Sequence, residues 1–136
     1  MIRYEEANDL RRKIEEIINV LELKHIKLER VFCFRSYGSN ARGIIARCHS
    51  LPKILQEALK TEPAYVIEVI AEKFEKLSEE EKTKILIHEL LHIPKSFKGG
   101  FVYHDHTIER KTKKLYQKFK ELKNRREQKN LNSSNV

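Results

Sequence analysis

Residues 78–93 read SEEEKTKILIHELLHI, and this stretch decides how the rest of the chain folds. Ser78 and Glu81 form the S-x-x-E pattern that begins a helix, and the glutamates after Ser78 suit the positive end of the helix dipole. From Ile85 to Ile93 the predicted helix is apolar on nearly every side, apart from two histidines and one glutamate. A helix that is apolar all round lies in the middle of a protein, so the other segments must pack around this one.

The segments on either side predict an α+β fold. Alternating apolar residues and turn residues predict three strands, over 26–35, 43–49 and 65–70. Apolar residues at helical spacing predict three further helices, over 4–23, about 52–59 and 107–123. We expect the first two strands to pair as a hairpin, because a loop rich in turn residues joins them. The expected architecture is an N-terminal helix, a small mixed sheet of three to four strands, the central helix and a C-terminal helix.

The length of 136 residues predicts one domain. We place this domain at 1–123 and expect a polar, frayed tail over 124–136. No apolar run approaches the roughly 20 residues that a helix needs to cross a bilayer. The N-terminus carries charges where a secretory signal needs an apolar stretch. The sequence therefore predicts a soluble protein of the cytoplasm that has no membrane partner.

The charge balance is basic, with 28 Lys and Arg residues against 20 Asp and Glu residues and a net charge of +8. Such a balance permits binding to nucleic acid, and the excess is concentrated at the C-terminal end. No nucleic-acid-binding motif is present, and aromatic residues make up only 8%, with no stacking pattern. We therefore interpret the excess as a solvated basic surface and do not expect nucleic acid as a partner.

Two cysteines, Cys33 and Cys48, are too few for a disulfide scaffold. Both fall in predicted strands, and no C-x-x-C pattern accompanies them. We expect two buried, reduced thiols that take no part in a metal site.

The central helix carries the motif His88-Glu89-Leu90-Leu91-His92, which has the pattern H-E-x-x-H. Residues four apart lie on one face of a helix, so both imidazoles can reach one metal ion. Glu89 then projects beside the ion, where it can accept a proton from a metal-bound water. Zn²⁺ is the expected ion, because imidazole ligands suit it. The structural alternative is a pair of core histidines bonded to the backbone.

A catalytic zinc site needs a third protein ligand, which the sequence offers in more than one place. His104 and His106 follow a Gly-Gly segment that could return the chain to the motif. Glu109 is a carboxylate alternative on the last predicted helix. From the residues alone, the choice between the two histidines stays open.

The run HELLHIPKSFKGGFVYH, residues 88–104, resembles the zincin metallopeptidases. It is most similar to the small minigluzincins, which resemble the catalytic domains of membrane zinc proteases of the HtpX and BlaR kind. This resemblance implies a zincin-like domain over 1–123, with His88, His92 and His104 as zinc ligands and Glu89 as the general base. It also implies latent forms that are closed by their C-terminal segments.

These observations together predict a zinc-dependent endopeptidase that acts on peptide or protein substrates. We expect a latent zymogen in which the segment after about Lys114 covers the cleft, within the chain or crosswise in a homodimer through helix exchange. Strand 65–70 is the expected site for an extended substrate, and Tyr103 and Tyr116 are candidate oxyanion donors. One alternative is a nucleic-acid-associated, SprT-like protease or a DNA- or RNA-binding protein. A second alternative is an inactive scaffold that the metal stabilises.

Overall fold

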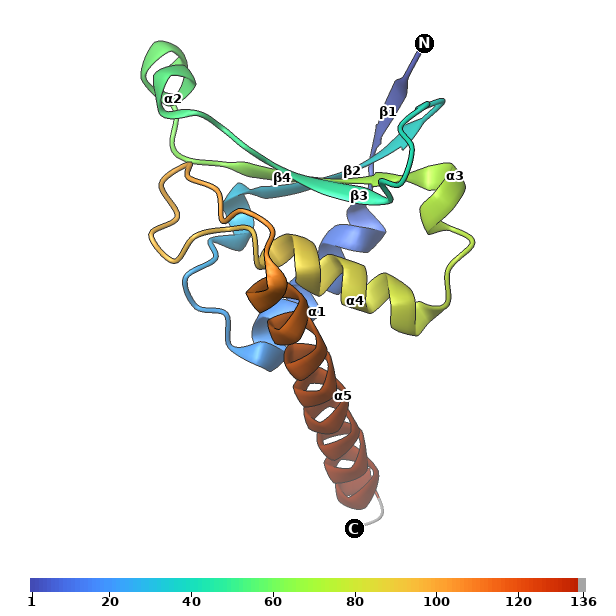
Figure 1. Cartoon of the computed structure of the whole chain (residues 1–136). Helices are drawn as coiled ribbons and strands as arrows, with labels where there is room; N and C mark the ends of the chain where they lie inside the picture. Colours follow the sequence, from blue (N-terminus) through green and yellow to red (C-terminus); the bar gives the residue numbers. More distant parts are fainter. Residues whose placement is uncertain (135–136) are drawn as a thin grey trace.

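A computed structural model of the chain describes residues 1–134, in which one four-stranded sheet carries its main helices on one face (Figure 1). The strands are β1 (Arg3–Glu6), β2 (Val31–Tyr37), β3 (Ala46–Ser50) and β4 (Tyr65–Ile70). Their order in the sheet is β1-β2-β4-β3. β2 and β4 are parallel, and the other two pairs are antiparallel. The predicted α+β class with a small mixed sheet is confirmed.

The core lies between the sheet and two helices, α1 (Asn8–Leu21) and α4 (Glu79–Leu90). Each helix turns an apolar face to the sheet, which is how elements with one apolar side exclude water. The residues of this core that are at most 1% exposed include Ile14, Ile17, Val31, Tyr65, Ile67, Val69, Leu86, Ile87 and Leu90. The helix that the sequence predicts over 78–93 is therefore central to the fold, as expected.

α4 begins as the sequence predicts. The hydroxyl of Ser78 accepts a hydrogen bond from the backbone N–H of Glu81 at 3.1 Å. The helix ends at Leu90, three residues before the predicted end. One further turn follows, because the N–H of His92 still donates to the carbonyl of Glu89 at 3.1 Å. The second histidine of the motif thus lies just past the end of the helix, in a turn that continues it.

The predicted hairpin between the first two predicted strands is wrong, because β4 lies between β2 and β3. β4 is the most apolar of the strands and is buried at five of its six positions. An interior strand with neighbours on both sides is the place for such a run. The connection over 38–45 carries the chain past that central position to the far edge.

The N-terminal helix is shorter than predicted. Residues 3–6 form β1, which pairs antiparallel with β2, and α1 starts only at Asn8. Local periodicity favoured a helix from residue 4 onward. Pairing with the otherwise open edge of β2 satisfies this backbone instead.

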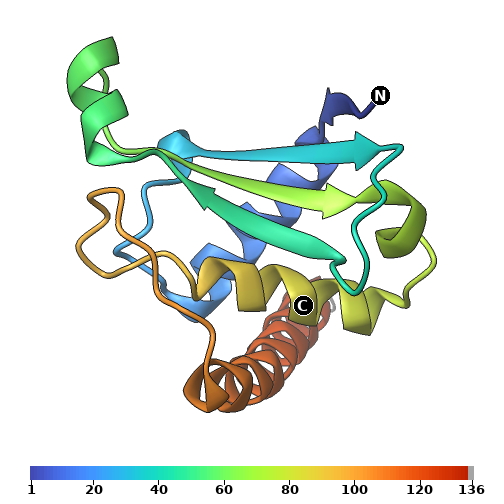
Figure 2. The same ribbon diagram turned by 45° about the horizontal axis from the view of Figure 1, so that its top comes forward.

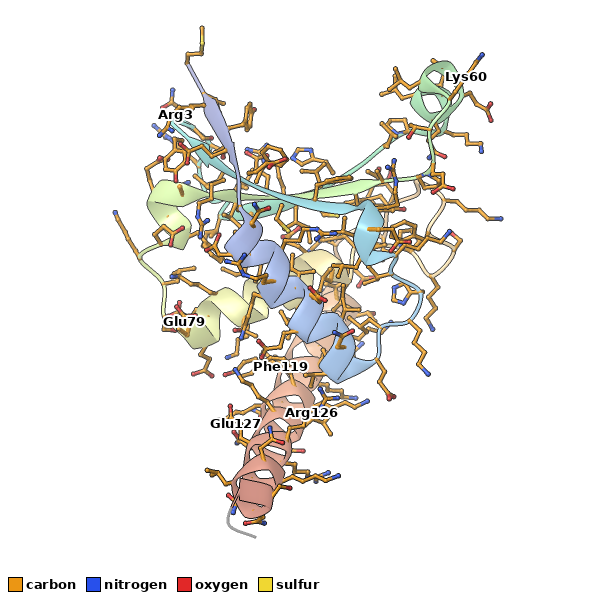
Figure 3. All side chains as sticks on the ribbon, turned by 180° about the vertical axis from the view of Figure 1, so that it is seen from behind. Arg3, Lys60, Glu79, Phe119, Arg126 and Glu127 are labelled. Carbon is orange, nitrogen blue, oxygen red and sulfur yellow. The ribbon has the colours of Figure 1, made fainter. Side chains whose placement is uncertain are left out.

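The C-terminal helix, α5 (His106–Ser134), is longer than predicted. Its first half packs on α1 and α4, and its second half projects away from the body (Figure 1). Figure 3 shows Phe119 at the junction and Arg126 and Glu127 on the projecting part. The described part of the segment expected to be a frayed tail is thus helical. No helix among residues 1–134 is both long and apolar enough to cross a membrane. The short elements are η1 (Leu28–Arg30), α2 (Lys53–Leu59) and α3 (Ala71–Phe74).

Candidate metal centre

Three histidines converge at one end of α4. His88 comes from the helix, His92 from the turn after it, and His104 from the loop that leads to α5. One ligand nitrogen from each lies within 4.8 Å of the other two. Nδ1 of His104 is 3.3 Å from Nε2 of His88. Within residues 1–134 this is the group that could hold a metal ion, and His106 lies outside it.

The nitrogen pair from His88 and His104 has the spacing of a tetrahedral zinc site. Zn–N bonds of about 2.0–2.1 Å place ligand nitrogens roughly 3.3–3.4 Å apart, which is the spacing between His88 and His104. Ligation needs neutral imidazoles. Burial lowers the pKa of His88, and the neighbouring His92 and His104 lower it further. His92 is buried and His104 is exposed, so the group opens to solvent on one side, as a catalytic site requires.

The second ring nitrogen of His92 has a backbone partner. Its Nδ1 lies 2.5 Å from the carbonyl oxygen of Val102, and the N–H of Val102 donates to the carbonyl of His92 at 2.8 Å. The ring of Phe101 stacks on the imidazole at 4.6 Å between centroids. A proton on Nδ1 satisfies the Val102 carbonyl, which leaves Nε2 free for a metal.

His104 is held from the side of α5. Its Nε2 lies 3.3 Å from Oε1 of Glu109, while its Nδ1 points to His88. Asp105 begins the helix, because its Oδ1 accepts the N–H groups of Thr107 at 2.8 Å and Ile108 at 3.2 Å. Glu109 thus contacts His104, but it is not one of the three residues whose ligand atoms lie together.

Glu89 lies beside the histidines and is only 6% exposed. Burial raises the pKa of its carboxyl to about 7, and a hydrogen bond offered by the backbone N–H of Cys48 acts in the opposite direction. Its side chain therefore lies between α4 and β3. A carboxyl group whose pKa is near neutral pH can both accept and return a proton.

A cleft of about 370 Å³ adjoins His88 and Glu89. Its other walls are residues 43–46, Lys84 and Ile85 of α4, and Thr112 of α5. The cleft thus joins the histidine group to the start of β3.

The strand that borders this cleft, β3, is one of the two edge strands of the sheet. On the side that faces β4, the carbonyl of Ile45 accepts the N–H of Ile70 at 2.8 Å, and the N–H of Leu51 donates to the carbonyl of Ala64 at 3.0 Å. In an antiparallel pair, alternate residues face inward, so Ala46 and Cys48 turn their backbone groups to the open edge. The prediction that strand 65–70 offers a substrate edge is wrong, because β4 is paired on both sides.

The two tyrosines considered as oxyanion donors lie in different places. Tyr116 is buried and lines a separate pocket with Lys13 and Phe119. Tyr103 is 82% exposed and precedes His104 directly. Neither the edge of β3 nor the Val102 carbonyl carries a local sequence signal, so neither is predictable from the sequence.

No curated protein sequence and no solved structure matches the chain. A family model described as "Putative phage metallopeptidase" matches residues 2–128. The matched range includes the three histidines and Glu89 and covers almost the whole chain. The chain therefore belongs to this family of phage metallopeptidases.

Proposed function

We propose that this protein is a zinc-dependent endopeptidase of the minigluzincin type. His88, His92 and His104 hold the metal, and Glu89 is the general base. One observation carries the proposal: three convergent histidine nitrogens lie next to a buried carboxylate at the wall of a cleft. The metallopeptidase family supports the coarser part of this assignment.

The residues of the chain divide the chemistry between them. A bound zinc ion supplies a Lewis acid that polarises the scissile carbonyl and lowers the pKa of a water molecule. Glu89 accepts the proton that this water loses and later gives it to the leaving amine. His92 is held in one tautomer by Val102, and His104 is oriented by Glu109.

The substrate lies along the edge of β3 in this proposal. The backbone groups of Ala46 and the carbonyl of Cys48 can pair with an extended peptide, which is how strands add to a sheet edge, whereas the N–H of Cys48 already bonds to Glu89. The cleft beside them has apolar walls from Ile44, Ile45 and Ile85. We expect it to accept a large apolar side chain next to the bond that is cleaved.

Glu89→Gln tests the role of the carboxylate. We expect this variant to keep one zinc per chain by elemental analysis and to lose roughly 10²–10⁴-fold in cleavage of a fluorogenic peptide. Wild-type protein treated with a chelator should also lose cleavage and regain it when zinc is added back. Loss of zinc from the variant would make Glu89 a ligand and overturn its role as base.

Latency within one chain needs residues after Lys114 over the cleft, and the structure places them elsewhere. Thr112 is the residue of α5 that lines the cleft, whereas Tyr116 and Phe119 line a different pocket. The crosswise form, in which α5 of a second copy covers the cleft, is the form of latency that we propose. The projecting half of α5, with Leu131 60% exposed, supports it.

A further inference from the structure

The loop over 91–105 brings the third histidine to the other two, and its path is fixed far from the histidines themselves. It leaves the end of α4, turns near the start of β4 and α2, and returns to α5 (Figure 2). Two buried side chains from outside the loop hold its turn. They are Tyr65, the first residue of β4, and Gln56 of α2.

Tyr65 is fully buried, and its hydroxyl makes two hydrogen bonds with the loop. The hydroxyl accepts the N–H of Gly99 at 3.0 Å and donates to the carbonyl of Gly100 at 2.9 Å. Its ring packs against Phe97 with 4.9 Å between centroids. A side chain of the central strand thus fixes three residues of the loop.

Gln56 is 4% exposed and holds the same turn from the other side. Its Nε2 donates to the carbonyl of Leu51 at 2.9 Å and to that of Lys98 at 3.0 Å. Gly99 passes so close that an added Cβ would lie 2.3 Å from this Nε2 and 2.6 Å from the Leu51 carbonyl oxygen. The turn therefore fits against the body with no space left for a side chain.

The backbone of the loop is strained at one residue, next to these contacts. Phe97 has a φ of +50°, which is unfavourable for a residue other than glycine, while its ring is 4% exposed. Such strain persists where the surroundings fix it, and it is concentrated at functional sites. After this turn the chain continues to Val102, which is hydrogen-bonded to His92, and then to His104.

We propose that Tyr65 and Gln56 are positioning residues for the third metal ligand. They act through the loop backbone and do not touch the metal. Their contacts place His104 where it meets His88 and His92, so they set metal affinity. This inference rests on the proposed function only in taking His104 as a ligand.

Tyr65→Phe tests the proposal, because it removes the hydroxyl and keeps the ring against Phe97. We expect zinc affinity, measured by competition with a chromophoric chelator, to fall about tenfold or more, as for other groups that orient ligands. The visible spectrum of the Co²⁺-loaded variant should lose part of its four-coordinate intensity. Tyr116→Phe is the matched control, since it removes the hydroxyl of another buried tyrosine, away from the loop, and its zinc affinity should be unchanged.

A double-mutant cycle with His104→Ala separates positioning from general loosening of the fold. In the His104→Ala background, Tyr65→Phe should cause no further loss of zinc affinity. An equal loss in both backgrounds, or none in the wild-type background, overturns the proposal.

Gln56→Ala carries the same test if Tyr65→Phe is unfolded by circular dichroism at the assay temperature. It should weaken zinc binding in the wild-type background and have no effect with His104→Ala. Wild-type protein that binds no zinc would instead refute the proposed function, and with it this inference.

Discussion

His104 and His106 differ by two positions in the chain, and the structure places them differently. His104 lies 3.3 Å from His88, whereas His106 is the first residue of α5 and lies outside the histidine group. The difference arises because Asp105, between them, caps the helix. The cap places His106 in the first turn of the helix and leaves His104 in the loop before it.

We predict that His104→Ala loses most of its zinc and that His106→Ala keeps one zinc per chain. The reason is that only the His104 ring nitrogen is within ligand distance of the other two. Elemental analysis after dialysis measures both variants. Zinc loss from His106→Ala together with retention by His104→Ala would reverse the assignment.

Cys33 and Cys48 lie opposite Ile67 on its two sides, in β2 and β3. Two strand spacings put them about 9–10 Å apart, beyond the reach of a disulfide. Burial raises the pKa of both thiols to about 12, so neither forms a reactive thiolate near neutral pH.

We predict that the native protein resists a thiol-specific reagent at pH 8 and that both cysteines react after unfolding in urea. A Cys33→Ala and Cys48→Ala double variant should keep its zinc and lose roughly 1–2 kcal/mol of unfolding free energy. Stoichiometric loss of zinc from that variant would reveal a metal site that includes sulfur.

Among the secondary-structure elements, Arg35 connects its own strand, β2, to α1 and to the segment that follows α3. Its guanidinium donates to both carboxylate oxygens of Asp9 in α1, at 2.7 Å and 2.8 Å, and to Glu75 after α3 at 2.5 Å. The hydrogen bond from Arg35 lowers the pKa of Asp9 from 3.8 to about 2, and partial burial acts against this shift. The start of α1 is thereby tied to β2 and to the segment before α4.

We predict that Asp9→Asn lowers the unfolding free energy by about 1 kcal/mol at pH 7, a modest value because the Asp9 side chain is 55% exposed. The folded pKa is depressed, so the stabilisation is complete above about pH 4 and is lost as the pH falls toward 2. Urea unfolding with a chelator present should show a difference near pH 2.5 that is roughly a third of the difference at pH 7, because the folded pKa of about 2 lies just below that pH. Glu121→Gln, on the exposed side of α5, is the matched control. A difference that is as large near pH 2.5 as at pH 7 would show that the charge of Asp9 is not its cause.

In the molecule as a whole, α5 determines much of the overall shape and carries most of the net positive charge. It carries ten of the Lys and Arg residues and three glutamates. Its apolar residues up to Leu122 face the body, where Phe119 is 4% exposed. Lys123 makes the last ion pair with the body that the structure describes, 3.1 Å from Glu16.

We predict that a chain ending at Asn124 keeps its zinc and melts within about 2 °C of the full chain, because the removed residues bury little surface. If α5 covers the cleft crosswise, the full chain should be dimeric by light scattering and cleave peptides more slowly than the shortened chain. A full-length monomer that cleaves at the same rate would refute the proposed latency. A cut at Lys114 would be a poor test, because it removes Tyr116 and Phe119 from the core.

The features of this protein that depend on short-range spacing were predictable from the sequence. Ser78 and Glu81 begin α4 as predicted, because capping is local chemistry. The motif puts His88 and His92 on one side of α4, because a helix repeats nearly every four residues. The α+β class followed from the alternation of helical and strand-like segments.

How those segments meet is visible only in the folded molecule. Strand order placed β4 inside the sheet and left β3 as the edge beside Glu89, and no local pattern encodes such an order. The meeting of His104 with His88 depends on a turn that Tyr65 and Gln56 hold from other elements. The physical reason is that hydrophobic burial is non-directional, so which surfaces come together is settled by packing the whole chain at once.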